Sequence, residues 1–467
     1  MGLRHCKRFL TCNMIGLMAV MMTGMVATVA TAATPIQMVK TKGGLTAWLM
    51  ESHQLPMLSV ELNFRAGSAF EPAGKEGLAQ FTASLLDEGA GPYDAHAFKD
   101  QLEAIGARFG GSSDTMDVSV NLTTLSQHAD RAFELMGMAV REPRFDDEAV
   151  ARVRSQLLAN LKRGEEDPAT VAWKLLRPRL MGNHPYANDG DGTAATLKAM
   201  GRKDLAGWHL ANFTRANVQI SVVGDISADR LAELLDSALL GLPAGAGRRG
   251  AELTPQAASV AAHITRTMPV PQGTVLLARR GLERHDPDFY PFVVMNEIFG
   301  GGVLTSRLGL DVREKHGLAY DVRATNRALP GGGMYVINLA TDNAKVQKAL
   351  DLVLENLNAM RDTPVTREEF DDAKSYLIGS FPLRLDSNTK LLNMMAMMQG
   401  EGLGVDYMDR WPARIAAVTF DDVQRVAKRV LVADDMVLSV VGQGPALKAQ
   451  WHGHGGRVPA QETTGDQ

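Results

Sequence analysis

The chain has 467 residues, of which 45% are hydrophobic and 22% are charged, and its net charge at pH 7 is -4. This is the composition of a globular protein with room for two or more domains, and the mildly acidic charge argues against a nucleic-acid-binding surface. Both cysteines, Cys6 and Cys12, lie near the N-terminus, so the remainder of the chain offers neither disulfides nor thiolate metal ligands.

The first 32 residues predict a secretory signal peptide. Arg4, Lys7 and Arg8 form a basic start, residues 14–29 form an apolar stretch, and an Ala-Thr-Ala cleavage signal ends at Ala32. An uncleaved membrane anchor is the alternative, but the apolar stretch is shorter than the roughly 20 residues that a spanning helix needs. We therefore expect a periplasmic or secreted protein that is cleaved after Ala32.

The elements that follow alternate between strands and helices. Apolar and polar residues alternate at positions 58–64, which predicts a strand with one buried face, and Leu78, Phe81 and Leu85 recur at helical spacing. The elements expected in the first half are strands at 44–51, 58–67, 117–123 and 218–224, and helices at 78–86, 126–140 and 146–166.

The second half repeats the first at a nearly constant spacing. The stretch NVQISVVGDIS at 217–227 resembles DMVLSVVGQGP at 435–445. A repeat at this spacing predicts a tandem duplication into two domains of about 200 residues each. The matched positions are Ser221 and Ser439, Asp204 and Asp422, both 218 residues apart, and Asn121 and Asn338, 217 residues apart.

These patterns predict an α+β fold made of two tandem homologous sandwich domains. Each domain is expected to hold a mainly antiparallel sheet with helices packed on one face. The join is rich in Gly, Ala and Pro and lacks an apolar period, which favours an exposed linker. The expected boundaries are a signal peptide at 1–32, an N-terminal domain at 33–241, a linker at 242–262, a C-terminal domain at 263–445 and a polar tail at 446–467.

Three stretches, at 65–90, 183–227 and 298–324, carry a resemblance to a known family. In this order they resemble the pitrilysin/insulinase-type zinc metallopeptidases, and in particular the two-domain members similar to the subunits of mitochondrial processing peptidase. The resemblance runs from about Gly43 to Gln443. It implies peptidase-like domains, with a degenerate zinc site in the first and an arginine–tyrosine substrate-binding motif in the second.

The resemblance implies a zinc motif, H-x-x-E-H, on the helix at 78–86. The two histidine positions fall on Gln80 and Ser84, the glutamate position falls on Ala83, and a distal glutamate is expected near Asn160. Catalytic zinc needs three strong protein donors and an open position for water. A carboxamide, a methyl group and a hydroxyl do not supply them. We expect no catalytic residue, metal or other cofactor in this chain.

The same resemblance implies that Arg313 and Tyr320 point into a substrate chamber and bind peptide. Thr305 or Ser306 can cap the helix that carries Arg313, Gly317 can end it, and Tyr320 is expected at the start of a strand. The alternative is that Arg313 pairs with Asp311 or Glu314 on the surface and that Tyr320 is a partly buried strand residue.

Loss of the zinc motif with retention of Arg313 and Tyr320 favours a division of labour between two chains. We expect a non-catalytic, substrate-binding subunit of an exported heterodimeric peptidase, whose partner carries H-x-x-E-H and the zinc and acts with it on peptides. The alternatives are a structural or peptide-binding protein of this fold with no role in proteolysis, and an enzyme with a relocated active site, for which the sequence offers no residue cluster.

Overall fold

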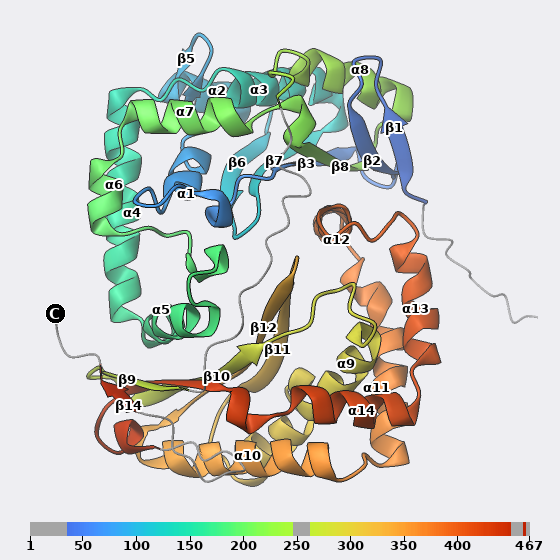
Figure 1. Cartoon of the computed structure of the whole chain (residues 1–467). Helices are drawn as coiled ribbons and strands as arrows, with labels where there is room; N and C mark the ends of the chain where they lie inside the picture. Colours follow the sequence, from blue (N-terminus) through green and yellow to red (C-terminus); the bar gives the residue numbers. More distant parts are fainter. Residues whose placement is uncertain (1–34, 246–261, 450–460, 464–467) are drawn as a thin grey trace, which may run out of the picture. The chain divides into compact units, whose positions relative to one another are not determined.

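The first half of the chain is built on a six-stranded sheet. A computed structural model describes residues 35–245, 262–449 and 461–463, so the predicted signal peptide and most of the predicted linker lie outside the described residues. Strands β2 and β8 run parallel, and the other neighbours in this sheet run antiparallel. Across the sheet the strands are β1 (Gln37–Lys40), β2 (Thr46–Glu51), β8 (Val218–Gly224), β3 (Met57–Phe64), β7 (Val118–Leu125) and β6 (Arg108–Ser113) (Figure 1).

The described part of the second half has a sheet in which five strands follow the same order, whereas the edge strands β1 and β14 are not equivalent. Strands β13 and β9 are parallel, as are β9 and β14, and the remaining neighbours are antiparallel. Strand β14 lies within the stretch that the sequence predicts as a polar tail. Across this sheet the strands are β14 (Gln461–Thr463), β9 (His263–Thr267), β13 (Val437–Gly442), β10 (Gln272–Arg280), β12 (Gly332–Asp342) and β11 (Val322–Leu329).

The strand registers match the duplication seen in the sequence. Ser221 and Asn121 both pair with Glu61 in the first sheet, and Ser439 and Asn338 both pair with Leu276 in the second. The repeated positions are therefore equivalent in three dimensions, and the spacing read from the sequence reports a true structural repeat.

Helices cover the outer face of each sheet. Strand β3 alternates its side chains, so that its apolar residues enter the first core. The helices of the first half are α1 (Leu78–Ala83), α2 (Ala95–Ala104), α3 (Ala129–Arg141), α4 (Asp147–Glu166), α5 (Pro168–Met181), α6 (Ala194–Ala199), α7 (Arg202–Asn212) and α8 (Ala228–Leu239). A small hairpin pairs β4 (Gly89–Ala90) with β5 (Tyr93–Asp94).

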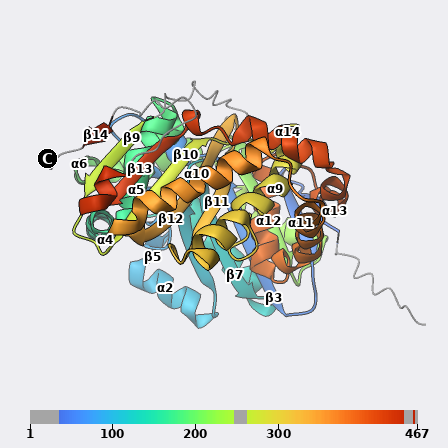
Figure 2. The same cartoon turned by 90° about the horizontal axis from the view of Figure 1, so that it is seen from below.

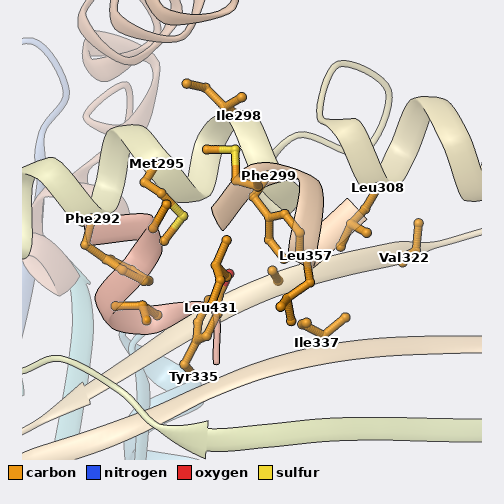
Figure 3. Packing of buried hydrophobic residues seen from close by; sticks show 14 of the residues in the cluster. Phe292, Met295, Ile298, Phe299, Leu308, Val322, Tyr335, Ile337, Leu357 and Leu431 are labelled. Atoms are coloured by element: carbon orange, nitrogen blue, oxygen red, sulfur yellow. The ribbon is translucent and has the colours of Figure 1, made fainter. Parts of the chain in front are cut away.

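In the second half, α9 and α10 cross the outer face of the second sheet (Figure 2). The core beneath α9 brings Phe292, Met295 and Phe299 against Tyr335 and Ile337 of β12 (Figure 3). The helices of this half are α9 (Phe289–Asn296), α10 (Val346–Asp362), α11 (Arg367–Ser380), α12 (Asn388–Gly400), α13 (Tyr407–Ala417) and α14 (Phe420–Val430). None of the described helices is both long enough and apolar enough to cross a membrane.

Two equivalent helices are exchanged between the halves. Helix α5 of the first half packs on β10 and β13 of the second sheet, and α12 of the second half packs on β3 and β8 of the first sheet (Figure 1). Ser439 donates a hydrogen bond to the Ala172 carbonyl on α5 (3.1 Å), and Gln399 on α12 donates to the Ser221 hydroxyl (2.7 Å). Each repeated serine thus holds the other half's helix.

Apolar side chains complete this exchange. Met395 and Met398 of α12 are fully buried in one cluster with Met50 and Val223 of the first sheet. A buried methionine stabilises the fold by about 1.5–3 kcal/mol relative to an exposed one. The halves are therefore joined through their cores and not through the predicted linker alone.

Truncating this contact is expected to destabilise both halves together. Met398→Ala should lower the free energy of unfolding by about 2–4 kcal/mol because it leaves a cavity between α12 and the first sheet. The measurement is urea unfolding of the purified chain, followed by far-UV circular dichroism and tryptophan fluorescence. Met38→Ala is the control, since Met38 is 61% exposed and should change the stability by less than about 0.5 kcal/mol.

A buried histidine makes the stability depend on pH. His209 of α7 donates a hydrogen bond to the Val140 carbonyl (2.9 Å) and contacts the ring of Phe213. Burial lowers the pKa of His209 from 6.5 to about 4. The unfolded chain therefore binds a proton below pH 6.5 that the folded chain takes up only near pH 4, so folding stability falls as the pH drops through this window.

At pH 5 this linkage should cost about 2 kcal/mol relative to pH 7.5. His209→Gln retains a donor for the Val140 carbonyl but does not titrate. The variant should therefore lose less stability between pH 7.5 and pH 5 than the natural chain, as measured by urea unfolding at both values. An equal loss in both proteins would show that His209 is not the group responsible.

Candidate functional site

The positions that the resemblance assigns to zinc lie on α1. The Gln80 amide donates a hydrogen bond to the Ser84 hydroxyl (2.9 Å). The Ser113 backbone N–H and hydroxyl, at the end of β6, donate to the Gln80 carbonyl oxygen (3.3 and 3.1 Å). Ala83 is fully buried. The polar groups on this face of α1 therefore bind one another and the neighbouring strand.

Helix α1 packs directly on β6. A β-carbon at Gly111 would lie 2.3 Å from the Ala83 carbonyl oxygen, so glycine is required for this close approach. The helix is consequently held as part of the scaffold, as its apolar spacing predicts.

The position expected for the distal glutamate falls on α4. Asn160 is exposed and hydrogen-bonds to Arg163. Arg154 of α4 reaches α1, because its guanidinium lies 5.6 Å from the centre of the Phe81 ring, and it donates hydrogen bonds to the Leu197 and Met200 carbonyls. A guanidinium has no lone pair for a metal ion.

Metal-ligating groups do not gather elsewhere in the described ranges. Residues 35–245, 262–449 and 461–463 contain no group of three or more His, Cys, Asp or Glu side chains that could hold a metal ion. The carboxamide of Gln80, the methyl group of Ala83 and the hydroxyl of Ser84 do not fit a catalytic zinc centre.

Arg313 and Tyr320 lie against each other on the surface of the second half. Arg313 is on the π-helical segment η6 (Gly309–Lys315), and its guanidinium lies 4.9 Å from the centre of the Tyr320 ring. The ring is 84% exposed. The Arg313 Nε lies 3.2 Å from a Glu314 carboxylate oxygen, so the alternative prediction that Arg313 pairs with Glu314 is confirmed. The alternative prediction that Tyr320 is partly buried was wrong.

Local geometry fixes this pair. The Ser306 hydroxyl accepts a hydrogen bond from the Gly309 N–H (3.2 Å), which selects Ser306 over Thr305 as the cap. Gly317 has a φ of 58°, as expected for the residue that ends a helix. The prediction that Tyr320 begins a strand was wrong. Strand β11 begins at Val322, and Tyr320 lies in the preceding loop, where the Leu318 carbonyl accepts the Thr341 hydroxyl.

The pair borders an open hollow of about 570 Å³. Its other wall is formed by Pro271 and Gln272 at the start of β10, by Asp342 at the end of β12 and by Lys345 after it. Asp342 and Lys345 form an ion pair of 3.2 Å. The charges around the hollow are thus paired locally, and a hydrogen-bonding ligand without net charge suits it.

Sequence reasoning missed the second wall of this hollow. Strands β11 and β12 form a hairpin in which Val322 pairs with Leu339. Extending that register places Tyr320 beside Thr341, close to Asp342. Pairing the two stretches at 322–329 and 332–342 as a hairpin would have predicted this wall from the sequence.

The chain matches two family profiles. The profile described as insulinase (peptidase family M16) matches residues 48–193, and the one described as peptidase M16 inactive domain matches residues 199–377. Between them they span both halves.

Individual relatives agree with these matches. The chain is 26% identical to the non-peptidase homolog YmxG of Helicobacter pylori over 392 residues, which cover 84% of this chain and 90% of the relative. It is 24% identical to the mitochondrial-processing peptidase subunit beta of Lentinula edodes over 423 residues, which cover 87% and 89%.

A solved structure shows the same fold. The crystal structure of a peptidase M16 inactive domain from Pseudomonas fluorescens superimposes with a TM-score of 0.81 at 29% identity, covering 88% of this chain and 98% of that one. The chain therefore belongs to the insulinase-type peptidase M16 family.

Proposed function

We propose that this protein is the non-catalytic, substrate-holding subunit of an exported heterodimeric peptidase. The observation that carries the proposal is the pairing of Arg313 with Tyr320 at 4.9 Å on an exposed hollow, in a chain whose zinc-motif positions offer no adequate ligand set. The partner would be a homologous chain that contains H-x-x-E-H, and peptides would be the substrate.

The chemistry of α1 supports a chain that is inactive by itself. Hydrolysis by a zinc peptidase needs a metal-bound water and a general base that accepts its proton. Ala83 stands where the base would lie, and the carboxamide of Gln80 already binds Ser84 and Ser113. We therefore propose that this chain has no catalytic zinc of its own and that the zinc resides in the partner.

The hydrogen-bonding chemistry of the hollow supports peptide binding. Arg313 presents a planar set of donors, and the exposed Tyr320 hydroxyl presents one more. Backbone carbonyls of an extended peptide are acceptors that match these donors. The same donors could stabilise the oxyanion that forms when the partner's zinc-bound water attacks the peptide bond.

The position of the hollow supports action on a partner's site. Asp342, which borders the hollow, ends β12, whereas the β11–β12 turn at the opposite end touches the first half through Arg327 and Thr115. Strand β12 has 11 residues, so roughly 30 Å separate its ends. Ser113, which contacts Gln80, lies two residues from Thr115. The chain's own α1 is therefore remote from Arg313.

Export is the remaining part of the proposal. The basic start, short apolar stretch and Ala-Thr-Ala sequence at 1–32 support cleavage by a signal peptidase. A chain without cysteines beyond Cys12 can fold in an oxidising compartment without disulfide pairing.

Removing the donors should impair the heterodimer's peptidase activity. With the exported H-x-x-E-H homologue from the same organism, Arg313→Ala should lower kcat/KM by about 10²-fold and Tyr320→Phe by about tenfold, because each removes donors to a developing negative charge. Hydrolysis of a quenched fluorescent peptide library measures this.

The matched control is Arg323→Ala on the neighbouring strand. Arg323 is half-exposed and pairs with Asp321 (2.8 Å), so this variant should retain full activity. If Arg313→Ala and Tyr320→Phe bind the partner normally and cleave peptides at the natural rate, the substrate-holding role fails.

We expect the zinc of the complex to be bound by the partner chain. We expect less than about 0.1 zinc per chain in this protein purified alone, and one zinc per heterodimer in the complex. Inductively coupled plasma mass spectrometry measures both. Chelation should abolish cleavage by the complex without changing the melting temperature of this chain alone. Stoichiometric zinc in the isolated chain, together with cleavage by it, would contradict the proposal.

A further inference from the structure

A second hollow lies where the two halves meet, away from Arg313 and Tyr320. It has a volume of about 330 Å³. Strand β3 and the β6–β7 turn line it from the first half, and the β11–β12 turn and α12 line it from the second. This volume lies at the lower end of the range of small-molecule sites, about 300–1,000 Å³. The charged groups in its lining are Glu61, Arg65, Asp114, Asp117, Arg327 and Glu401.

Four of the lining groups are satisfied within the chain. Arg65 pairs with Asp117 (3.1 Å) and donates to the Gly400 carbonyl (3.2 Å). Glu401 lies 3.8 Å from Arg284. The Asp114 carboxylate accepts backbone N–H groups from the β6–β7 turn. Two charges, those of Glu61 and Arg327, remain to be accounted for.

Glu61 is a buried carboxylate without a cation. Glu61 is 8% exposed, and its carboxylate accepts a hydrogen bond from the Asn63 amide (2.9 Å). Burial, and to a lesser degree the nearby Asp114, raise the pKa of Glu61. An isolated buried carboxylate is costly, and an ammonium group placed beside it would relieve that cost.

Arg327 is a cation without a carboxylate among the described residues. Its guanidinium donates to the Thr115 hydroxyl (3.3 Å). The exposed guanidinium of Arg327 lines the hollow. A carboxylate matches its donor geometry.

We propose that the hollow between the halves binds a zwitterion of amino-acid or dipeptide size, with its ammonium at Glu61 and its carboxylate at Arg327. Thr115, the hydrogen-bond partner of Arg327, adjoins Asp114, which lies close to Glu61. The unmatched charges thus face one pocket. The site is independent of the Arg313 hollow and requires no partner subunit.

Four probes separate the zwitterion from its singly charged fragments. Isothermal titration calorimetry and thermal melting of the mature chain would use L-alanine and L-alanyl-L-alanine as zwitterions. N-acetyl-L-alanine lacks the ammonium, and L-alaninamide lacks the carboxylate. At least one zwitterion should bind and raise the melting temperature, and both blocked forms should bind about tenfold more weakly or worse.

Two variants tie binding to the pocket. Arg327→Ala and Glu61→Gln should each weaken zwitterion binding by about tenfold or more. Arg323→Ala, on the same strand as Arg327, should bind normally. Because Glu61 is buried, binding by Glu61→Gln counts only if the circular dichroism spectrum of the variant matches that of the natural chain. If it does not match, the test rests on Arg327→Ala, since Arg327 is exposed.

Three outcomes would overturn the assignment. The first is that neither zwitterion binds at about 10 mM, a concentration far above the dissociation constants of usual ligands. The second is that the blocked probes bind as tightly as the zwitterions. The third is that Arg327→Ala binds the zwitterion with unchanged affinity. None of these measurements involves the peptidase partner. The zwitterion site can therefore be disproved while the proposed function stands, and the proposed function can be disproved while the zwitterion site stands.

Discussion

The exchange of α5 and α12 between the two sheets is the constraint on which the rest of the structure depends. A sheet with helices on one face leaves its other face in need of cover. Here each half covers the other's sheet with the equivalent helix, and Ser221 and Ser439 each form a hydrogen bond with one of the two helices. Because both contacts are apolar and hydrogen-bonded, neither half retains its own sheet environment if they separate. The duplication is thus a structural requirement as well as a record of ancestry.

This exchange also determines where the functional groups lie. It brings the β6–β7 and β11–β12 turns together, which creates the charged hollow of Glu61 and Arg327. At the far end of the second sheet, η6 carries Arg313 and the loop after η6 carries Tyr320, and both border the other hollow. The degenerate helix α1 and the arginine–tyrosine pair therefore belong to different regions of one chain. The proposed division of labour between two chains agrees with this separation.

Much of the fold could be predicted because its signals are local or repeated. Alternation placed β3, an apolar run placed β8, and the spacing of Ser221 and Ser439 gave the equivalence of two strands without any contact being known. The exchange of helices could not be predicted, because Ala172 and Ser439 meet across 267 residues and amphipathic patterns do not state which sheet a helix covers. Tyr320 was misplaced by two residues because the alternation of Leu318, Tyr320 and Val322 continues into a loop. The sequence also could not predict that Glu61 is buried without an ion-pair partner among the described residues, because this depends on which groups the fold brings near it.

The proposed function requires that this chain holds a peptide for another chain's zinc. The most direct measurement is a structure of the complex with the H-x-x-E-H homologue and a bound, uncleaved peptide. The account predicts zinc on the partner's helix, with Arg313 and Tyr320 within hydrogen-bonding distance of the peptide carbonyl at that zinc. A complex in which the pair faces solvent, or in which the peptide reaches the zinc without touching this chain, would contradict it.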